Sequence, residues 1–537
     1  MRMLPPDTVA GVEPVQSVQP VDTPVLVVGG GPAGLAAAAE LSLHGIDCVV
    51  IEPRTAVSHR RPRAKTTSVR TMEHLRRWGV ADQLRRAAPL AVEWSQRVTF
   101  CESLTGRRIT DFDGAFGLTT RRSDLFAESG QQVPQPVVED VLRTHLAGQP
   151  GVQLLLGLTV TGLEQDADVV RVSVSDSADG GYVVTARWVL GCDGAGGVVR
   201  DQIGSQYIGR SDPRPNFNVV FRAPDLDTHL GPAVQYWVVG GRATGLVGRL
   251  DLAGIWWAIM PGIGAEYGSA HASELITDLI GGPTAGLEVL ATDPWTARLL
   301  VADSFGSGRV FLVGEAAHVN PPWGGHGFNT SVGDAVNIAW KIAAVEHGWA
   351  SPGLLATYEQ ERRGVVEQTV ACAEANMLAM AGDLPADEAV IQRVKRAEFH
   401  SLGLVLGYSY AGSAAIKPGS GGLAGAGESF VIADTTTYTP TAEPGARLPH
   451  AWLPDGSSLY DRLGQGFTLL GSPDRAGRPG RLLEEARERG IPLTVFDPPA
   501  GYPWRDEFLL VRPDQHIAWR TTDPSSIDLD RVIGGRA

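Results

Sequence analysis

Pro24-Val-Leu-Val-Val-Gly29-Gly-Gly31-Pro-Ala-Gly34 is an apolar, largely β-branched run that leads directly into three spaced glycines. An alanine-rich segment follows at 35–43, and a second apolar run at 46–51 ends at Glu52. The pattern predicts a strand, a tight turn, a helix and a second strand that is closed by an acid. This context distinguishes a dinucleotide-binding βαβ unit from an isolated glycine turn.

The residues of this unit suit a dinucleotide for separate physical reasons. Gly29 allows the tight turn, Gly31 leaves the backbone open to a pyrophosphate, and Gly34 lets helix and strand pack closely. The free N–H groups at the helix N-terminus attract the diphosphate, and Glu52 can accept hydrogen bonds from a ribose diol. The sequence therefore predicts a dinucleotide site built on residues 29–34 and 52.

The bulk composition indicates a globular protein of two or three domains. The chain has 537 residues, 43% of them hydrophobic, and a net charge of −14. This acidic balance argues against nucleic acid or an anionic membrane as the main partner. No apolar run approaches the ~20 residues of a membrane span. The four cysteines are scattered and lack the spacing of metal ligands, which favours a reducing compartment. A cytoplasmic location is the default expectation, and residues 1–22 are expected to form a flexible extension.

Two further glycine-bearing turns follow strand-like runs far along the sequence. The run 183–190 ends at Gly191-Cys-Asp193-Gly194, and the run 308–313 ends at Gly314-Glu315. In one parallel sheet, these turns and the first would all lie at the carboxyl ends of strands. We therefore expect the three turns to surround one long ligand. A glycine-rich loop, Pro321-Pro-Trp-Gly-Gly-His-Gly-Phe-Asn329, follows the third turn.

These motifs, in this order over about 24–385, resemble those of the single-component FAD-dependent aromatic hydroxylases of the para-hydroxybenzoate and phenol hydroxylase kind. That family has the glycine fingerprint, a DG motif, and a GD motif followed by a proline-rich flavin loop. The resemblance implies an α/β fold in which a Rossmann-like FAD-binding domain is interleaved with a β-sheet substrate domain. The tail from 447 resembles the thioredoxin-like C-terminal αβ domain of the larger members. This tail has no cysteine, so its expected role is dimerisation or stabilisation, and a homodimer is one expectation.

The resemblance carries the cofactor contacts of the family onto individual positions. Arg63 matches an arginine that reaches the FAD, Gln135 matches a glutamine that contacts it, and Glu315 stands where the family has aspartate. The extra methylene of Glu315 keeps the charge but requires a small shift of the loop. The FAD-binding residues implied in this way are Gly29, Gly31, Pro32, Ala33, Gly34, Glu52, Arg54, Arg63, Gln135, Asp193, Gly194, Arg200, Glu315, Pro322, Gly325, Gly327, Phe328 and Asn329.

The same resemblance divides the chain into domains. The FAD-binding domain would comprise 23–95, 126–205 and 295–385, and the substrate-binding domain 96–125 and 206–294. Residues 386–446, whose second half is rich in Gly, Ser, Thr and Pro, would form a helix and a linker. The thioredoxin-like domain would then occupy 447–537.

The resemblance implies an NAD(P)H- and FAD-dependent monooxygenase. NADPH or NADH would reduce the FAD as a transient co-substrate, O2 would add to it, and the flavin C4a-hydroperoxide would hydroxylate a phenolic or polycyclic aromatic substrate. Water must be kept out, so an aromatic lining is expected. Candidates for this lining are Trp237, Trp256, Trp257 and Trp323, each of which is equally consistent with strand core.

A base or a cation near the phenolic oxygen would speed the hydroxylation, because a phenolate is more electron-rich than a phenol. Arg222, Tyr236 and His326 are candidates for this role, and a solvent-facing loop position is an equal expectation for His326. Asp111 and Asp113 are expected to be loop acids.

Three alternatives to hydroxylation stay open on the sequence. A flavin peroxide could attack a ketone in Baeyer–Villiger fashion, or epoxidise a polyketide. Trp256-Trp257-Ala-Ile-Met-Pro261 loosely resembles the Trp-x-Trp-x-Ile-Pro element of flavin-dependent halogenases, but with different spacing. A non-catalytic flavoprotein that binds an aromatic ligand is the alternative of another class.

Overall fold

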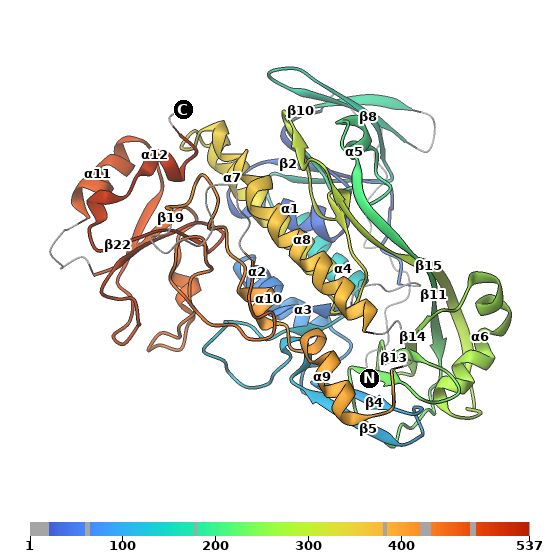
Figure 1. Cartoon of the computed structure of the whole chain (residues 1–537). Helices are drawn as coiled ribbons and strands as arrows, with labels where there is room; N and C mark the ends of the chain where they lie inside the picture. The colour runs from blue at the N-terminus through green and yellow to red at the C-terminus, as the bar shows by residue number, and fades with distance from the viewer. Residues whose placement is uncertain are drawn as a thin grey trace.

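The computed structural model describes residues 21–59, 65–176, 180–379, 384–418, 431–472 and 479–535. Two eight-stranded sheets and one four-stranded sheet organise this part of the chain. Figure 1 shows the C-terminal module in orange and red on the left and the second eight-stranded sheet on the right, with two long helices between them.

The first sheet is the parallel scaffold that the sequence predicts. Its strands run in the order β17-β10-β1-β2-β7, all parallel. β16 extends this sheet antiparallel at one edge, and the ribbon of β8 and β9 attaches through β10. The strands are β1 (Val21–Val28), β2 (Cys48–Glu52), β7 (Val152–Leu156), β8 (Thr159–Gln165), β9 (Val170–Ser175), β10 (Gly181–Gly191), β16 (Gly306–Ser307) and β17 (Val310–Leu312).

The parallel register brings the three glycine turns to one edge of this sheet. The N–H of Cys192 donates to the carbonyl of Val28 (2.8 Å), and the N–H of Val313 donates to the carbonyl of Gly191 (2.9 Å). The turns after β1, β10 and β17 therefore begin side by side, as the sequence predicts.

Helices cover the first sheet. α1 (Pro32–Leu43) packs against α4 (Gln135–Ala147) and α7 (Gly327–Glu346). A Cβ added at Gly34 would lie 1.9 Å from the carbonyl oxygen of Gly29, so only glycine lets α1 approach β1 this closely. α7 begins at Gly327, within the stretch 321–329 that the sequence predicts as a glycine-rich loop. The other helices of this domain are α2 (Val69–Arg77), α3 (Ala81–Ala87), α5 (Val198–Gln202) and α8 (Thr357–Leu378).

The second sheet has the order β18-β15-β11-β14-β13-β12-β4-β5. Helix α6 (Ala265–Ile280) covers one face, where Phe217, Tyr236 and Trp256 are buried with it. Trp237 and Trp257 point to the opposite face because side chains alternate along a strand. The strands are β4 (Arg97–Cys101), β5 (Arg108–Asp113), β11 (Tyr207–Arg222), β12 (Gln235–Val238), β13 (Gly245–Arg249), β14 (Ile255–Pro261), β15 (Glu288–Ala302) and β18 (His318–Val319).

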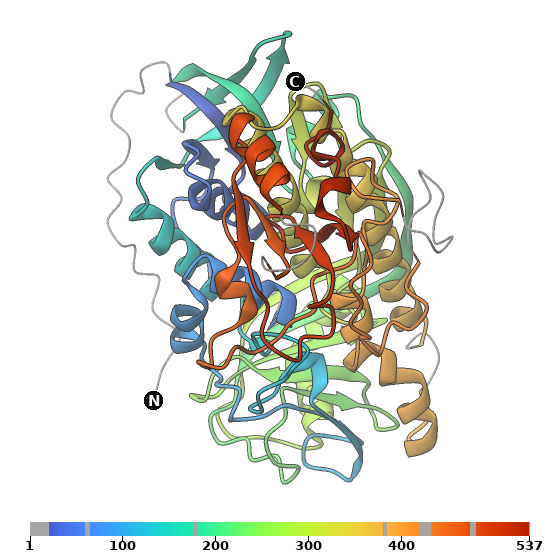
Figure 2. The same cartoon turned by 90° about the vertical axis from the view of Figure 1, so that its left-hand side faces the viewer.

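The C-terminal module forms the four-stranded sheet β20-β19-β21-β22. β19 (Phe467–Leu470) and β20 (Leu493–Phe496) are parallel, whereas β21 (Phe508–Val511) and β22 (Ile517–Thr521) run antiparallel, as in thioredoxin-like sheets. α11 (Gly480–Glu488) and α12 (Leu529–Val532) accompany this sheet, and α9 (Glu388–Phe399) and α10 (Leu402–Leu406) precede it in the chain. Figure 2 shows the module lying in front of the first domain.

A buried ionic cluster joins this module to the first domain. Glu361 of α8 accepts hydrogen bonds from Arg512 Nη1 (2.7 Å) and Nη2 (2.8 Å), and from Lys341 Nζ of α7 (2.8 Å). All three side chains are fully or almost fully buried. Burial raises the pKa of Glu361, but Arg512 and Lys341 outweigh burial and hold it well below its usual range. The cluster therefore contributes stability only while it is complete.

We expect the substitution Glu361→Ala to destabilise the protein by about 3–5 kcal/mol. It removes the carboxylate that pairs with Lys341 and leaves Arg512 only its second partner, Asp514, so the buried cluster keeps an excess of positive charge. Urea unfolding followed by tryptophan fluorescence measures this change. The matched control is Asp497→Ala, which breaks an exposed ion pair with Arg505. We expect no measurable change for this control. Equal unfolding midpoints for the two variants would contradict the proposed role of the cluster.

Candidate active site

A cavity of about 780 Å³ runs between the carboxyl edge of the first sheet and the inner face of the second. Gly31, Asp193 and Glu315, one residue from each glycine turn, line one part of it. Trp257 and Trp295 of the second sheet line another part. The cavity thus connects the dinucleotide-binding motifs with an aromatic surface.

Most residues expected to bind FAD border this cavity. The structure places there Gly29, Gly31, Pro32, Ala33, Glu52, Arg54, Gln135, Asp193, Gly194, Glu315, Pro322, Gly325, Gly327 and Phe328. These positions are spread over nearly 300 residues of sequence and converge because the three turns share one sheet edge. Their convergence is the geometry that a long ligand requires.

Glu52 closes β2 beside the first glycine turn. Its Oε2 accepts the N–H of Gly30 (2.7 Å), and its Oε1 accepts the N–H (3.0 Å) and Nε (2.6 Å) of Arg54. Burial raises the pKa of Glu52. The hydrogen bonds and the charge of Arg54 lower it by more, so the net pKa lies below its ordinary value. The carboxylate is therefore charged, and Oε2 keeps an acceptor position for a ribose hydroxyl.

Asp193 lines the cavity and has one buried carboxylate oxygen without a hydrogen-bond partner among the described residues. This oxygen is Oδ1, whereas Oδ2 accepts the N–H of Val199 at the start of α5 (3.0 Å). A Cβ added at Gly31 would meet no atom of the described chain within 4 Å, so the backbone there is open to the cavity. An unsatisfied acceptor and an uncovered helix N-terminus suit the hydroxyls and the diphosphate of FAD.

Three other predicted positions support the site from behind its lining. Gly34 allows the contact of α1 with β1 described above. Arg200 lies over the ring of Tyr207 (3.9 Å) and donates to the carbonyl of Ala195 (3.1 Å), which holds the second glycine turn. Asn329 accepts the N–H of Ser68 (2.8 Å) and donates to the carbonyl of Gly325 (2.7 Å). Arg63 lies outside the described residues.

The third glycine turn is anchored by buried Asp334 of α7. Asp334 Oδ2 lies 2.6 Å from His318 Nε2 and accepts the N–H of Gly314 (3.3 Å). Its Oδ1 accepts Arg362 Nε (2.7 Å). Burial raises the pKa of Asp334, but Arg362 and His318 outweigh it, so the net pKa is lowered. His318 therefore holds the third glycine turn through Asp334, and it does not line the cavity.

Tryptophans dominate the part of the cavity formed by the second sheet. Trp257, Trp295 and Trp323 all line it, and Trp295 meets Trp323 edge to face at 5.7 Å and 77°. Trp295 Nε1 donates to Asn218 Oδ1 (2.8 Å), which fixes this ring on β15. Flat, rigid indoles suit an aromatic ligand and exclude water.

Two tryptophans expected in the lining belong to the core instead. Trp237 is buried against Phe100 (5.3 Å) and Phe399 (5.6 Å). Trp256 faces α6, where its Nε1 donates to the carbonyl of Ala223 (3.2 Å). Strand alternation separates Trp256 from its neighbour Trp257, which does line the cavity.

None of the three candidate bases lines the cavity. Arg222 lies at the end of β11, half-exposed and paired with Glu288 (3.3 Å). Tyr236 faces α6 and donates to the carbonyl of Gly231 (2.5 Å), and burial raises its pKa. His326 is buried at the start of α7 instead of facing solvent, and burial lowers its pKa to about 4. These placements favour another group as the base.

The acids at 111 and 113 are on a strand, not in a loop. Asp111 and Asp113 belong to β5, where Asp111 accepts Thr99 Oγ1 (2.8 Å) and Asp113 accepts Arg97 Nε (2.9 Å). Both belong to the edge of the second sheet and do not border the cavity.

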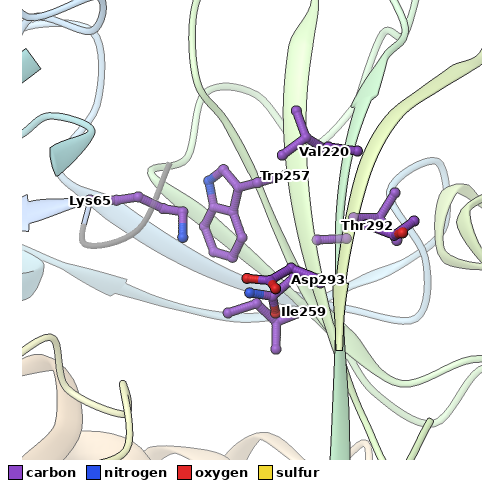
Figure 3. Close-up of a pocket in the computed structure, with 10 residues that line it drawn as sticks. Lys65, Val220, Trp257, Ile259, Thr292 and Asp293 are labelled. Carbon is purple, nitrogen blue, oxygen red and sulfur yellow. The ribbon is translucent and has the colours of Figure 1, made fainter. Parts of the chain in front are cut away.

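The structure adds lining residues that the sequence reasoning did not single out. Among them are Lys65, Phe116, Asn218, Gln235, Asp293, Trp295, Arg298 and Glu398. Three of them, Asp293, Trp295 and Arg298, lie on β15, a strand that contains Pro294, a residue that is unusual within a strand. Lys65 lies at the end of the basic stretch 59–65, and the structure places its side chain beside Trp257, in the same recess as Asp293 (Figure 3).

Comparison with known families decides the class of the protein. Residues 22–373 match the family model described as FAD binding domain, and residues 441–534 match the one described as aromatic-ring hydroxylase, C-terminal.

The chain belongs to the FAD-dependent aromatic-ring hydroxylases.

Relatives agree with this assignment over nearly the whole chain. The hydroxylase is 30% identical to 2,4-dichlorophenol 6-monooxygenase of Delftia acidovorans, covering 93% of this chain and 95% of that protein. It is also 30% identical to tetracenomycin B2 monooxygenase-dioxygenase of Streptomyces olivaceus, covering 96% and 98%. The structure of the rebeccamycin biosynthetic enzyme RebC with reduced flavin matches with a TM-score of 0.84 at 30% identity, covering 96% and 100%.

The hydroxylase is thus an oxidoreductase, a flavoprotein monooxygenase with FAD as cofactor and NADPH or NADH and O2 as co-substrates. The fold expected from the sequence, with a C-terminal domain of the hydroxylase type, is confirmed. Among the described residues, no helix is both long and apolar enough to cross a bilayer.

We expect Gly31→Ala to weaken FAD binding by about 10-fold or more with little effect on stability, because the added methyl group would project toward the diphosphate. FAD titration of the apoprotein, followed by flavin fluorescence, measures the change. Gly264→Ala is a matched control, since Gly264 also precedes a helix in an extended conformation with open space around it, but outside the cavity. Equal FAD affinities for the two variants would contradict the placement of the diphosphate.

Proposed function

We propose that this hydroxylase oxidises a phenolic ring, alone or as part of a fused aromatic system, bound against the second sheet. The observation that carries the proposal is the indole surface of Trp257, Trp295 and Trp323 in the same cavity as the three glycine turns. The name of the 30%-identical relative from Delftia acidovorans gives a chlorinated phenol as its substrate, which supports the same class here.

We further propose that FAD lies along the carboxyl edge of the first sheet. Gly31 and the N-terminus of α1 would take the diphosphate, Glu52 the ribose and Asp193 a further hydroxyl. The loop of Pro322 and Gly325 would face the flavin ring from the substrate side. When bound, the flavin supplies the activation of O2 that amino-acid side chains cannot provide.

The residues of the chain then have three tasks. The indoles orient the aromatic ring, and their packing excludes water, which would otherwise divert the reaction to H2O2. The buried ion pairs of Asp334 and Glu361 hold α7 and α8, which support the cofactor edge. This arrangement also supports stabilisation as the role of the C-terminal module, because Arg512 of that module completes the cluster.

The purified protein should show a flavin absorbance spectrum and oxidise NADH or NADPH slowly by itself. Addition of the correct phenol should accelerate this oxidation and yield a product heavier by one oxygen atom. A panel of single-ring phenols, including 2,4-dichlorophenol, and fused-ring phenols identifies the substrate class by mass spectrometry. Substrate-independent oxidation with H2O2 as the sole product across the whole panel would contradict the proposed phenol hydroxylation.

A further inference from the structure

Lys65 occupies a fixed position at the boundary between the two large sheets. It directly precedes β3 (Thr66–Thr67), which pairs antiparallel with β6 (Gln131–Gln132). Its carbonyl oxygen accepts the N–H of Val133 (2.7 Å), so the backbone is held on the first domain. Its side chain lines the cavity formed with the second sheet, and Figure 3 shows it extending toward Trp257.

The ammonium group of Lys65 lies against an aromatic face at the wall of the cavity. Nζ is 4.1 Å from the centroid of the Trp257 ring. An added Cβ at Gly248 on the adjacent strand would lie 2.6 Å from Trp257 Nε1, so the indole rests flat across that strand. A ring fixed in this way holds the cation without neutralising it.

A small recess opens beside this cation. It measures about 20 Å³ and shares Lys65, Asn218, Trp257, Ile259 and Asp293 with the main cavity. This volume accommodates a single oxygen atom or water molecule but no aromatic ring. A ring held in the main cavity by the tryptophans could therefore direct one oxygen substituent into the recess, next to Lys65.

Three other charged side chains border the cavity near Lys65, and none of them, among the described residues, forms an ion pair with it within 4.0 Å. Asp293 of β15 places a carboxylate at the same recess and also has an interaction with its surroundings. Glu398 of α9 lines the cavity but pairs with Lys395 (2.9 Å), and Arg298 of β15 is a further cation in the lining. Burial alone lowers the pKa of Lys65 to about 8.

Lysine is rare in this chain, which makes its use at the cavity informative. The sequence has 46 lysines and arginines, and only four of them, at 65, 341, 395 and 417, are lysine. Lys341 and Lys395 are paired with Glu361 and Glu398, and Lys417 donates to the carbonyl of Arg520 (2.9 Å). An amine can release its proton near neutral pH when it is buried, whereas a guanidinium cannot.

We propose that Lys65 is a catalytic residue that receives the phenolic hydroxyl of the substrate in the recess and takes its proton; this inference rests on the phenol-hydroxylating function proposed above. The O–H bond breaks, its electron pair stays on oxygen, and the proton binds the lone pair of Nζ. The products are a phenolate and an ammonium ion in contact, so the net charge of the site is unchanged. The phenolate ring is then more electron-rich for oxygen transfer.

Binding of a chromogenic phenol tests the contact without catalysis. The FAD-loaded protein is titrated with 4-nitrophenol one pH unit below the pKa of the free dye, where the dye is mainly neutral and colourless. The wild-type protein should bind it as the coloured phenolate. Lys65→Met should lose the phenolate band and bind about 10-fold or more weakly, whereas Lys65→Arg should keep the band because it keeps the charge.

The matched control for this titration is Lys417→Met, the same substitution at a lysine that also lies over an indole, that of Trp519 (5.3 Å), in the C-terminal module. This variant should bind like the wild-type protein. Flavin content shows whether each variant is folded. A phenolate band of equal intensity in Lys65→Met and the wild-type protein would overturn the proposal.

The pH dependence of turnover separates proton transfer from simple attraction of charge. With a phenol from the panel as substrate, kcat/KM of the wild-type protein should rise as the pH passes about 8, because only the neutral amine accepts the proton. This rise should be absent in both Lys65→Met and Lys65→Arg, with kcat/KM reduced by ~100-fold or more at its plateau. Their activity should increase only toward the pKa of the phenol itself, about 10.

The outcomes distinguish this inference from the function on which it rests. If the wild-type protein hydroxylates phenols and Lys65→Met has the same kcat/KM and pH profile, the role of Lys65 is overturned and the proposed function stands. If the wild-type protein neither binds 4-nitrophenol nor hydroxylates any phenol of the panel, both are overturned.

Discussion

The cofactor edge of this hydroxylase depends on the buried carboxylate of Asp334. Asp334, on α7, is hydrogen-bonded to His318 at the end of the third glycine turn and to the N–H of Gly314 within that turn. It also accepts a hydrogen bond from Arg362 on α8. Because each partner would be left as an unsatisfied buried group without it, these elements form together. The position of the third turn, and with it the opening of the cavity, follows from this constraint.

Much of the scaffold can be predicted from sequence because its signals are local. An apolar run, three spaced glycines and a closing acid specify strand, turn and helix within 30 residues, and the order of the strands follows from the parallel pairing of such units. β15 escapes this reasoning because Pro294 disrupts its pattern, and pairing with β11 over almost its full length overrides that local preference. α7 begins early because Asn329 ties its first turn to Ser68 and Gly325.

The substrate side of the cavity is harder to predict because it is set by the face of each strand. Trp256 and Trp257 are adjacent residues of the same type, yet Trp256 packs on α6 and Trp257 lines the cavity. Tyr236 is a plausible base by residue type, but side chains alternate along β12, and this alternation points Tyr236 toward the core. Lys65 has no motif around it that indicates catalysis, and its position over Trp257 at the recess is a property of the assembled sheets.

The ionic cluster around Glu361 has an evolutionary consequence. Its two halves are encoded far apart, with Lys341 and Glu361 in the first domain and Arg512 in the last. A recombination event that replaced the C-terminal module alone would leave two charges of the recipient facing a foreign surface. Natural exchange of this module between lineages is therefore disfavoured unless the donor supplies an arginine at the same place, and the two regions should descend together as one inherited unit.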